Sequence, residues 1–272
     1  MLINAKTLLC CIIGKPVNHS LSPQMHNAAF KSLNLNYVFL AFNVTNLKKA
    51  IEGLKAINCR GIVVTIPHKV KVIKFLDGLD TASENIGAVN VIKNLNGKLI
   101  GGNSDWIGAI QSLKEKTSLK NKKVAVLGAG GAARAIIYGL KKEQAEIHLF
   151  NRSVNKAEKL ASDFQLKNIY PLSAKKDISN CQIIINATSV GMEPDDNSPV
   201  PERFLHKDQF VFDIVYTPHQ TRLLKFAQNK EAIPIFGYKM VLYAGLEIFK
   251  LFTKKNPPLK VMEEALLTNL HS

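Results

Sequence analysis

One short segment constrains the fold of this chain more than any other. In VAVLGAGGAARA, the residues Gly128, Gly130 and Ala133 follow the pattern G-x-G-x-x-G/A, directly after an apolar run and at the start of a predicted helix. The first glycine permits a tight turn, the second lets the backbone approach a pyrophosphate, and the small third residue lets helix and strand pack closely. The amides at the start of the helix then face the phosphates. The segment predicts a dinucleotide-binding unit.

The end of the next predicted strand, about 20 residues further on, indicates which dinucleotide binds. An NAD-binding chain usually carries Asp or Glu there, to bind the ribose 2′-hydroxyl. This sequence has Asn151 and Arg152 instead, and Lys156 can add a second positive charge. A guanidinium pairs with a 2′-phosphate, which a carboxylate would repel. We therefore expect NADP rather than NAD.

The order of apolar runs and helical patterns predicts an α/β fold with two domains. The first hundred residues alternate strand and helix, which favours a mostly parallel sheet covered by helices. Asn96 and Gly97, between two further apolar runs, are a strong hairpin signal. After a polar connector, a second alternation has uniformly apolar strands, as in a doubly wound Rossmann-type sheet. The predicted segments are 1–105, 106–237 and the C-terminal helices 238–272.

The strong positive charge does not by itself indicate a nucleic-acid partner. A formal net charge of +15 attracts phosphates without any special motif. However, the lysines are spread along the whole chain, and no aromatic-basic module or recognition helix accompanies them. We expect small-molecule partners and no specific nucleic-acid binding.

Composition also argues against a membrane protein and a metal protein. No stretch approaches the roughly 20 uninterrupted apolar residues of a membrane helix, and the first apolar run reads better as a buried strand. We therefore expect a cytoplasmic protein with no membrane contact. The cysteines lack metal-like spacing, so we expect buried free thiols and no metal site. These cysteines are Cys10, Cys11, Cys59 and Cys181.

Three polar clusters in the N-terminal half are not explained by core packing. They are 18–23 (NHSLSP), 65–69 (TIPHK), and 87–90 (GAVN) followed by 103–105 (NSD). With these clusters the chain resembles the shikimate dehydrogenase family over nearly its whole length. The resemblance rests on a set of motifs in the family's order, which is more specific than any one of them: HSLSP, VTIPHK, GAVN, GNSDWIG, GAGGAARA, NRS, NATSVGM and DIVY.

The resemblance implies a fold and an activity. Residues 1–105 would be the substrate-binding catalytic domain, completed by 238–272, with the Rossmann domain inserted between and the active site in the cleft. The implied reaction is the reversible, NADP-dependent reduction of 3-dehydroshikimate to shikimate in aromatic amino-acid (chorismate) biosynthesis, by a monomer or homodimer.

The resemblance also implies roles for individual residues. Lys69 and Asp105 would form the catalytic pair. Substrate would be bound by Ser20 and Ser22 at its carboxylate, with Tyr216 nearby, and by Thr65 and Asn90 at the ring and hydroxyls. The cofactor residues would be Gly128, Ala129, Gly130, Gly131, Ala132, Ala133, Asn151, Arg152 and Thr188.

The implied catalytic pair suits hydride transfer. As hydride reaches a carbonyl carbon, negative charge grows on oxygen, and an ammonium such as Lys69 can stabilise it and deliver a proton. Asp105 would orient the ammonium and also raise its pKa. The sequence leaves open whether Lys69 is the proton donor or an electrostatic anchor.

Three positions depart from the family pattern. Val63 stands where the family usually has Asn, Lys239 where it has Gly, and Ala244 where it has Gln. Ala244 cannot hydrogen-bond a substrate hydroxyl, so a quinate or amino-shikimate dehydrogenase is an alternative. A non-catalytic sensor of the same fold is another, although a pure binder has no need for both Lys69 and Asp105.

Overall fold

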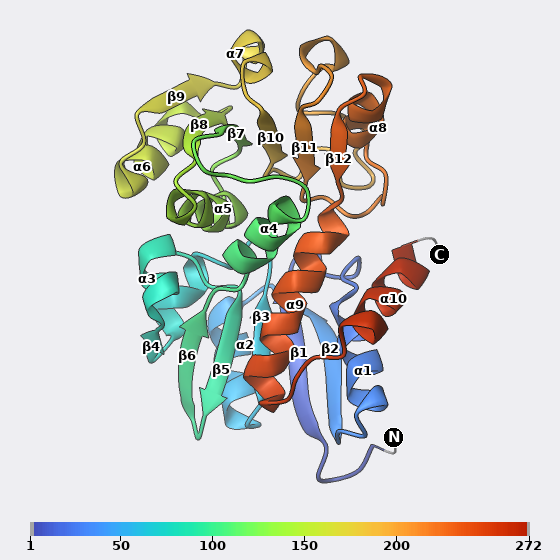
Figure 1. The fold of residues 1–272 in the computed structure, drawn as a ribbon. Helices are drawn as coiled ribbons and strands as arrows, with labels where there is room; N and C mark the ends of the chain where they lie inside the picture. Colours follow the sequence, from blue (N-terminus) through green and yellow to red (C-terminus); the bar gives the residue numbers. More distant parts are fainter. Residues whose placement is uncertain (1–2, 271–272) are drawn as a thin grey trace. The chain divides into compact units, whose positions relative to one another are not determined.

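The structure is a computed structural model that describes residues 3–270, and it divides into two compact α/β units (Figure 1). The first unit is the chain up to Ser104 together with the segment from Ala244 onward, and the second unit is Asp105–Tyr243. The predicted boundaries follow residues 105 and 237, whereas the units divide after Ser104 and Tyr243. Helix α9 (Gly237–Thr253) contains the second boundary, so the chain changes unit inside a continuous helix.

The first unit is built on a six-stranded sheet with the order β2-β1-β3-β5-β6-β4. Strand β1 is parallel to β2 and β3, and β4 is parallel to β6, whereas β5 is antiparallel to β3 and β6. Helix α10 lies beside α1. The elements are β1 (Leu8–Gly14), α1 (Ser22–Ser32), β2 (Tyr37–Asn43), α2 (Leu47–Ala56), β3 (Gly61–Val64), a 3-10 helix (Lys71–Phe75), β4 (Gly78–Leu79), α3 (Thr81–Ile86), β5 (Val91–Leu95), β6 (Lys98–Gly102) and α10 (Leu259–Leu270).

Local signals explain several ends of these elements. Asn96 and Gly97 join β5 to β6 with positive φ angles of 53° and 88°, as a two-residue type I′ turn requires. The predicted hairpin is therefore confirmed. Asp80 caps α3 by accepting a hydrogen bond from the Ser83 amide at 2.7 Å, and Gly87 ends this helix with a φ of 66°.

The second unit has a six-stranded parallel sheet with the order β12-β11-β10-β7-β8-β9. This is the strand order of a doubly wound dinucleotide-binding fold, and it reverses between β7 and β10. The predicted Rossmann-type domain is confirmed. The elements are α4 (Asp105–Lys114), β7 (Lys123–Leu127), α5 (Gly131–Lys142), β8 (Glu146–Asn151), α6 (Val154–Phe164), β9 (Asn168–Pro171), α7 (Lys175–Ser179), β10 (Ile183–Asn186), a 3-10 helix (Glu202–Phe204), β11 (Phe210–Asp213), α8 (Arg222–Asn229) and β12 (Ile233–Ile235).

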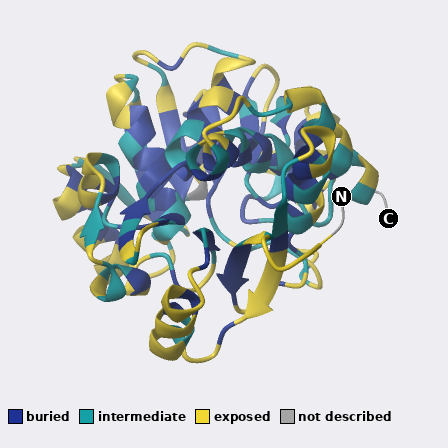
Figure 2. Ribbon diagram, turned by 90° about the horizontal axis from the view of Figure 1, so that it is seen from below, coloured by how far each residue is buried: buried dark blue, intermediate teal, exposed yellow. Residues whose placement is uncertain are grey.

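Burial on both faces of this sheet explains why its strands are uniformly apolar. Along β7, Val124 and Val126 pack into the cluster that contains α5, whereas Ala125 and Leu127 pack into the cluster that contains α8. Successive side chains of a strand point to opposite faces, so both faces of β7 are covered. Figure 2 colours the buried residues of the chain dark blue. All four cysteine side chains are also buried, as predicted.

The core of the first unit contains a fully buried histidine. His26 lies on α1, and its ring stacks on Phe39 with centroids 4.6 Å apart. Its Nδ1 atom has no hydrogen-bond partner within the part of the chain that the structure describes. Burial lowers the pKa of His26 from 6.5 to about 3, because the imidazolium would lose its hydration there.

This buried histidine predicts a loss of stability in acid. The pKa of His26 in the folded state lies below the unfolded value of 6.5. Its contribution to the free energy of unfolding is therefore present above pH 6.5 and is lost as pH falls toward 3. We expect the free energy of unfolding to fall by about 2 kcal/mol more in the native chain than in His26→Phe between pH 7 and pH 5, measured by urea denaturation. In the control, His206→Phe at an exposed position, the free energy of unfolding should change with pH as it does in the native chain. An equal change in the native chain and in His26→Phe would contradict the assignment.

Candidate active site

The loop after β3 carries the predicted catalytic lysine and is held at several points within the first unit. The Thr65 amide donates to the Ile13 carbonyl at 2.9 Å, and the His68 amide donates to the Thr65 carbonyl at 2.9 Å. The His68 side chain is buried, with Nε2 3.1 Å from the Val44 carbonyl oxygen. His68 therefore fixes the loop, and the half-buried Lys69 follows it directly.

Hydrogen bonds bring together Lys69, Asn90 and Ser104. The Val89 amide donates to the Lys69 carbonyl at 2.8 Å, which places Asn90 next to the lysine backbone. Asn90 Nδ2 donates to Ser104 Oγ at 3.0 Å, and the Ser104 amide donates to Asn90 Oδ1 at 2.7 Å. Asp105 directly follows Ser104 in the chain, is buried, and is the first residue of α4 and of the second unit.

The two serines predicted to bind the carboxylate lie together at the start of α1. Both side chains are buried, and the Ser22 amide donates to Ser20 Oγ at 3.3 Å. Ser22 is the first residue of the helix and Pro23 follows it. Hydroxyl groups and unpaired amides at a helix N-terminus are suited to an anion such as a carboxylate.

The glycine loop of the second unit has the geometry that a dinucleotide requires. Gly128 has a φ of 113°, and an added Cβ there would lie 2.9 Å from Thr188 Cγ2, so both conformation and space demand glycine. At Gly130, an added Cβ would meet no described atom within 4 Å, which leaves the space that a pyrophosphate needs. Gly130 is the N-cap of α5, and Ala133 is fully buried in the core. The residues present therefore fit the cofactor. Ala129, Gly131 and Ala132 are half-buried within the same loop and first turn.

The end of β8 carries positive charge where an NAD enzyme carries an acid. Asn151 is the last residue of β8, and its Nδ2 donates to the Ser153 carbonyl at 2.7 Å. Arg152 comes next and is exposed, as is Lys156 in the first turn of α6. A phosphate at this strand end would therefore meet a guanidinium.

Thr188 and Tyr216 follow the carboxyl ends of β10 and β11. Thr188 Oγ1 donates to Asn186 Oδ1 at 2.6 Å, and Tyr216 is half-buried. Sequence reasoning missed Asn186 and Asp213, the buried residues that end these two strands. The signal for them was present, because each is a single polar residue that closes an apolar run within or beside a quoted motif.

The three positions that depart from the family pattern lie in different surroundings. Val63 is buried in β3 and pairs with Val91 of β5. Ala244 is buried in α9. Lys239 forms an ion pair with Glu115, with Nζ 3.3 Å from Oε1, and the Tyr243 hydroxyl also donates to Glu115. The lysine is thus held inside the second unit by a carboxylate that follows α4.

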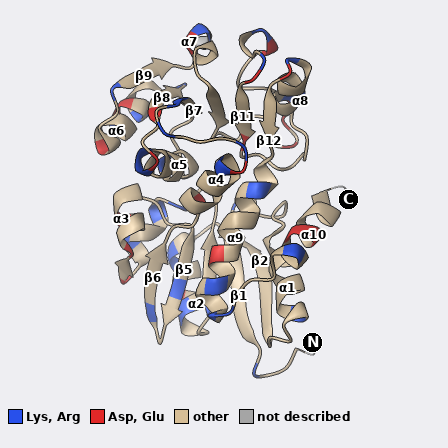
Figure 3. Cartoon of the chain, in the orientation of Figure 1, with Lys and Arg blue, Asp and Glu red and all other residues tan. Residues whose placement is uncertain are grey.

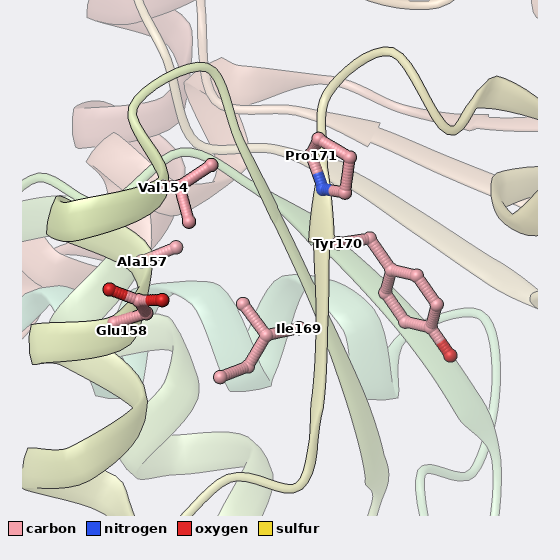
Figure 4. Close-up of a pocket in the computed structure, with 6 residues that line it drawn as sticks. All are labelled: Val154, Ala157, Glu158, Ile169, Tyr170 and Pro171. Atoms are coloured by element: carbon pink, nitrogen blue, oxygen red, sulfur yellow. The ribbon is translucent and has the colours of Figure 1, made fainter.

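Figure 4 shows a pocket between α6 and β9 that holds none of the predicted site residues. Its lining is mostly apolar, with the Glu158 carboxylate as its one charged group. The lining residues are Val154, Ala157, Glu158, Ile169, Tyr170 and Pro171. Across residues 3–270 there is also no group of three His, Cys, Asp or Glu side chains able to hold a metal, and no helix long and apolar enough to cross a membrane.

Comparisons with known proteins match the chain in both units. The family model described as "Shikimate dehydrogenase substrate binding domain" matches residues 12–92, and the model "Shikimate / quinate 5-dehydrogenase" matches residues 111–218. The chain is 45% identical to a "Shikimate dehydrogenase (NADP(+))" of Methanobrevibacter smithii, over 99% of both chains.

Solved structures agree with the sequence matches. A crystal structure of a shikimate dehydrogenase in complex with NADP+ is 42% identical and superposes with a TM-score of 0.92, covering 99% of this chain and 98% of that one. The shikimate 5-dehydrogenase of Thermus thermophilus, in complex with NADP(H) and shikimate, is 32% identical with a TM-score of 0.89, covering 96% of this chain and 99% of that one.

Proposed function

This chain belongs to the shikimate dehydrogenase family, an NADP-dependent oxidoreductase family, and we propose that it reversibly reduces 3-dehydroshikimate to shikimate in aromatic amino-acid biosynthesis. One observation carries the proposal. In the first unit, Asn90 is hydrogen-bonded to Ser104 and follows Val89, whose amide binds the Lys69 carbonyl; in the second unit, the chain makes a tight turn at Gly128 and leaves open space at Gly130.

In this proposal the second unit binds the cofactor. NADP supplies or accepts the hydride when it is bound. The amides that follow Gly128 receive the pyrophosphate at the start of α5, where the helix dipole favours negative charge. Arg152 pairs with the 2′-phosphate, with Asn151 beside it at the end of β8. Thr188 contacts the cofactor at the end of β10.

The first unit binds the substrate and places the catalytic lysine. Ser20 and Ser22 donate their hydroxyl hydrogens to the substrate carboxylate, and Tyr216 is a further substrate-binding residue of this proposal. Thr65 and Asn90 contact the ring and its hydroxyls. The Asn90 amide is already held by Ser104, so its orientation is set before substrate arrives.

Catalysis depends on the lysine ammonium. As the carbonyl carbon gains hydride, its oxygen becomes an alkoxide, and Lys69 Nζ donates a hydrogen bond to that oxygen. A proton must reach the same oxygen to complete the hydroxyl, and the ammonium that already contacts this oxygen can donate it; the reverse reaction returns it. Asp105 orients the ammonium.

We further propose a monomer or homodimer that works in the cytoplasm on small molecules and has no specific nucleic-acid partner. Figure 3 shows lysine and arginine on helices and loops of both units. This spread, with a formal net charge of +15, favours attraction of small anions to the surface in general.

A substrate panel tests the proposed function. The purified chain is incubated with NADP and with shikimate, quinate or amino-shikimate, and the absorbance of reduced cofactor is followed. We expect the highest specificity constant with shikimate. A higher value with quinate or amino-shikimate would move the assignment to that substrate. Ligand binding without any reduced cofactor would indicate a sensor, and salt-sensitive DNA retention without NADP dependence would indicate a nucleic-acid-binding protein.

The substitution Ala244→Gln tests the altered hydroxyl recognition. An amide at this position would supply the hydrogen bond that alanine lacks, so we expect the Michaelis constant for shikimate to fall by about two- to tenfold with little change in kcat. Lys239 is engaged by Glu115 and should not compete with the new amide. The control is Ala41→Gln on the exposed part of β2. A lower specificity constant on shikimate would mean that the site is built around Ala244.

A further inference from the structure

A fully buried polar cluster closes the ends of β10 and β11 in the second unit. Its members are Asn186, Asp213 and Thr221, each with no exposed surface. Asp213 Oδ1 accepts hydrogen bonds from Asn186 Nδ2 at 2.9 Å and from the Val215 amide at 3.0 Å, and Oδ2 accepts from Thr221 Oγ1 at 2.7 Å. None of the binding or catalytic roles described above involves these residues.

Asn186 also hydrogen-bonds to the loop that carries Thr188. Its Oδ1 accepts from the Thr188 amide at 3.1 Å and from Thr188 Oγ1 at 2.6 Å, while its Nδ2 also donates to the Val190 carbonyl at 3.0 Å. The Val190 amide donates back to Thr188 Oγ1 at 3.1 Å. The loop is therefore wrapped around the side chain of Asn186, whose own orientation is fixed by Asp213.

The loop that carries Thr188 lies at the point of the sheet where a dinucleotide binds. The strand order reverses between β7 and β10, and a dinucleotide binds across the crevice at such a switch point. Gly128 directly follows β7 and packs against Thr188, because an added Cβ there would lie 2.9 Å from Thr188 Cγ2. Arg152 lies on the opposite side of β7, at the end of β8. The adenosine half of a bound cofactor thus belongs to the Arg152 side and the nicotinamide half to the Thr188 side.

We propose that Asp213 and Asn186 are positioning residues for the nicotinamide half of the cofactor, because Asp213 fixes Asn186 and Asn186 holds Thr188 against the glycine loop. The inference rests on the proposed use of NADP. A carboxylate suits the position of Asp213, since all three of its partners are donors.

Two further observations support this role. An added Cβ on Gly237 would lie 2.5 to 2.7 Å from the carbonyl oxygens of residues 213 to 215, so the start of α9 packs directly on the segment after Asp213. Burial raises the pKa of Asp213 to about 6, against the lowering effect of its hydrogen bonds to Thr221, Val215 and Asn186. These three hydrogen bonds favour the carboxylate form, because each partner donates to one of its oxygens.

The test compares two ligands that share one half of the cofactor. NADPH reaches both sides of the switch point, whereas 2′,5′-ADP carries only the adenosine half with its 2′-phosphate. We expect Asn186→Ala and Asp213→Ala to raise the dissociation constant of NADPH by about tenfold or more and to change that of 2′,5′-ADP by less than about twofold. Both constants are measured by titration calorimetry.

Conservative and control variants make the outcome specific. In Asp213→Asn the amide oxygen can still accept from Asn186 and Val215, and its NH2 can donate to Thr221 Oγ1, so we expect near-native NADPH binding. Asp196→Ala removes a carboxylate that is 71% exposed in the same unit and should leave both constants unchanged. If Asp213→Ala fails to fold, Asn186→Ala and Asp213→Asn still decide the question.

Three results would overturn the inference. Equal weakening of NADPH and 2′,5′-ADP in Asn186→Ala would indicate general damage to the unit, and unchanged NADPH binding would show that the cluster does not position the cofactor. A loss in Asp213→Asn as large as that in Asp213→Ala would contradict the acceptor geometry. A native chain that binds neither NADPH nor 2′,5′-ADP would instead overturn the proposed function. The native chain is therefore titrated first, before any variant is made.

Discussion

The Lys69→Ala variant is expected to lose about 10²-fold or more in turnover while its affinity for NADPH stays close to that of the native chain. The reason is that the ammonium interacts with charge that develops on the substrate oxygen only as hydride moves. Removing it raises the barrier without touching the dinucleotide loop of the second unit. The measurements are kcat in both directions of the reaction and the dissociation constant of NADPH.

Two companion variants sharpen this experiment. Lys71→Ala removes an exposed lysine two residues away and should leave turnover unchanged. Lys69→Arg keeps the positive charge but cannot give up a proton near neutral pH, so it retains activity if the lysine is an electrostatic anchor and loses it if the lysine is the proton donor. Nearly intact turnover in Lys69→Ala would place catalysis at another residue.

The Arg152→Ala variant is expected to weaken NADPH much more than NADH, by about 1.5 to 3 kcal/mol, the range of a hydrogen bond to a charged group. The 2′-phosphate is present only in NADPH, and Arg152 is the exposed cation at the end of β8, where an NAD enzyme would carry an acid. The dissociation constants of both cofactors are measured on the native chain and the variant.

The matched control is Arg222→Ala, which removes an arginine elsewhere in the second unit whose side chain is 46% exposed. It should leave both dissociation constants as they are in the native chain. An equal loss of NADPH and NADH binding in Arg152→Ala would contradict the assignment of Arg152 to the 2′-phosphate, because it would show that the arginine contacts a part common to both cofactors.

The sheet of the second unit was predictable because burial on both faces makes its strands uniformly apolar. Residues such as Val124 and Ala125 face opposite sides of β7, and both sides are covered, so the run had to be apolar throughout. The Asn96 and Gly97 hairpin was predictable because few other residue pairs accept positive φ at both positions. The strands β4, β9 and β12 have only two to four residues, too few for a period to show.

Long-range pairing explains what the sequence left undecided. The direction of the Lys239 side chain depends on Glu115, which lies 124 positions earlier. The roles of Asn186 and Asp213 likewise depend on contacts between the ends of two strands. The sequence marks both as polar residues that close apolar runs, but such residues are common at strand ends, and only their mutual burial gives these two a specific role.

The division of the first unit into two chain segments affects the order in which it can fold during synthesis. Its sheet lies entirely before Ser104, but the face of α1 that bears Met25 and His26 is covered by later residues, including Phe249 of α9 and Met262 of α10. The ribosome therefore completes the whole second unit, which is continuous in the chain, before that face can be closed. Until then this apolar face of α1 has no cover from α9 and α10, and a chaperone that binds apolar surfaces can bind there.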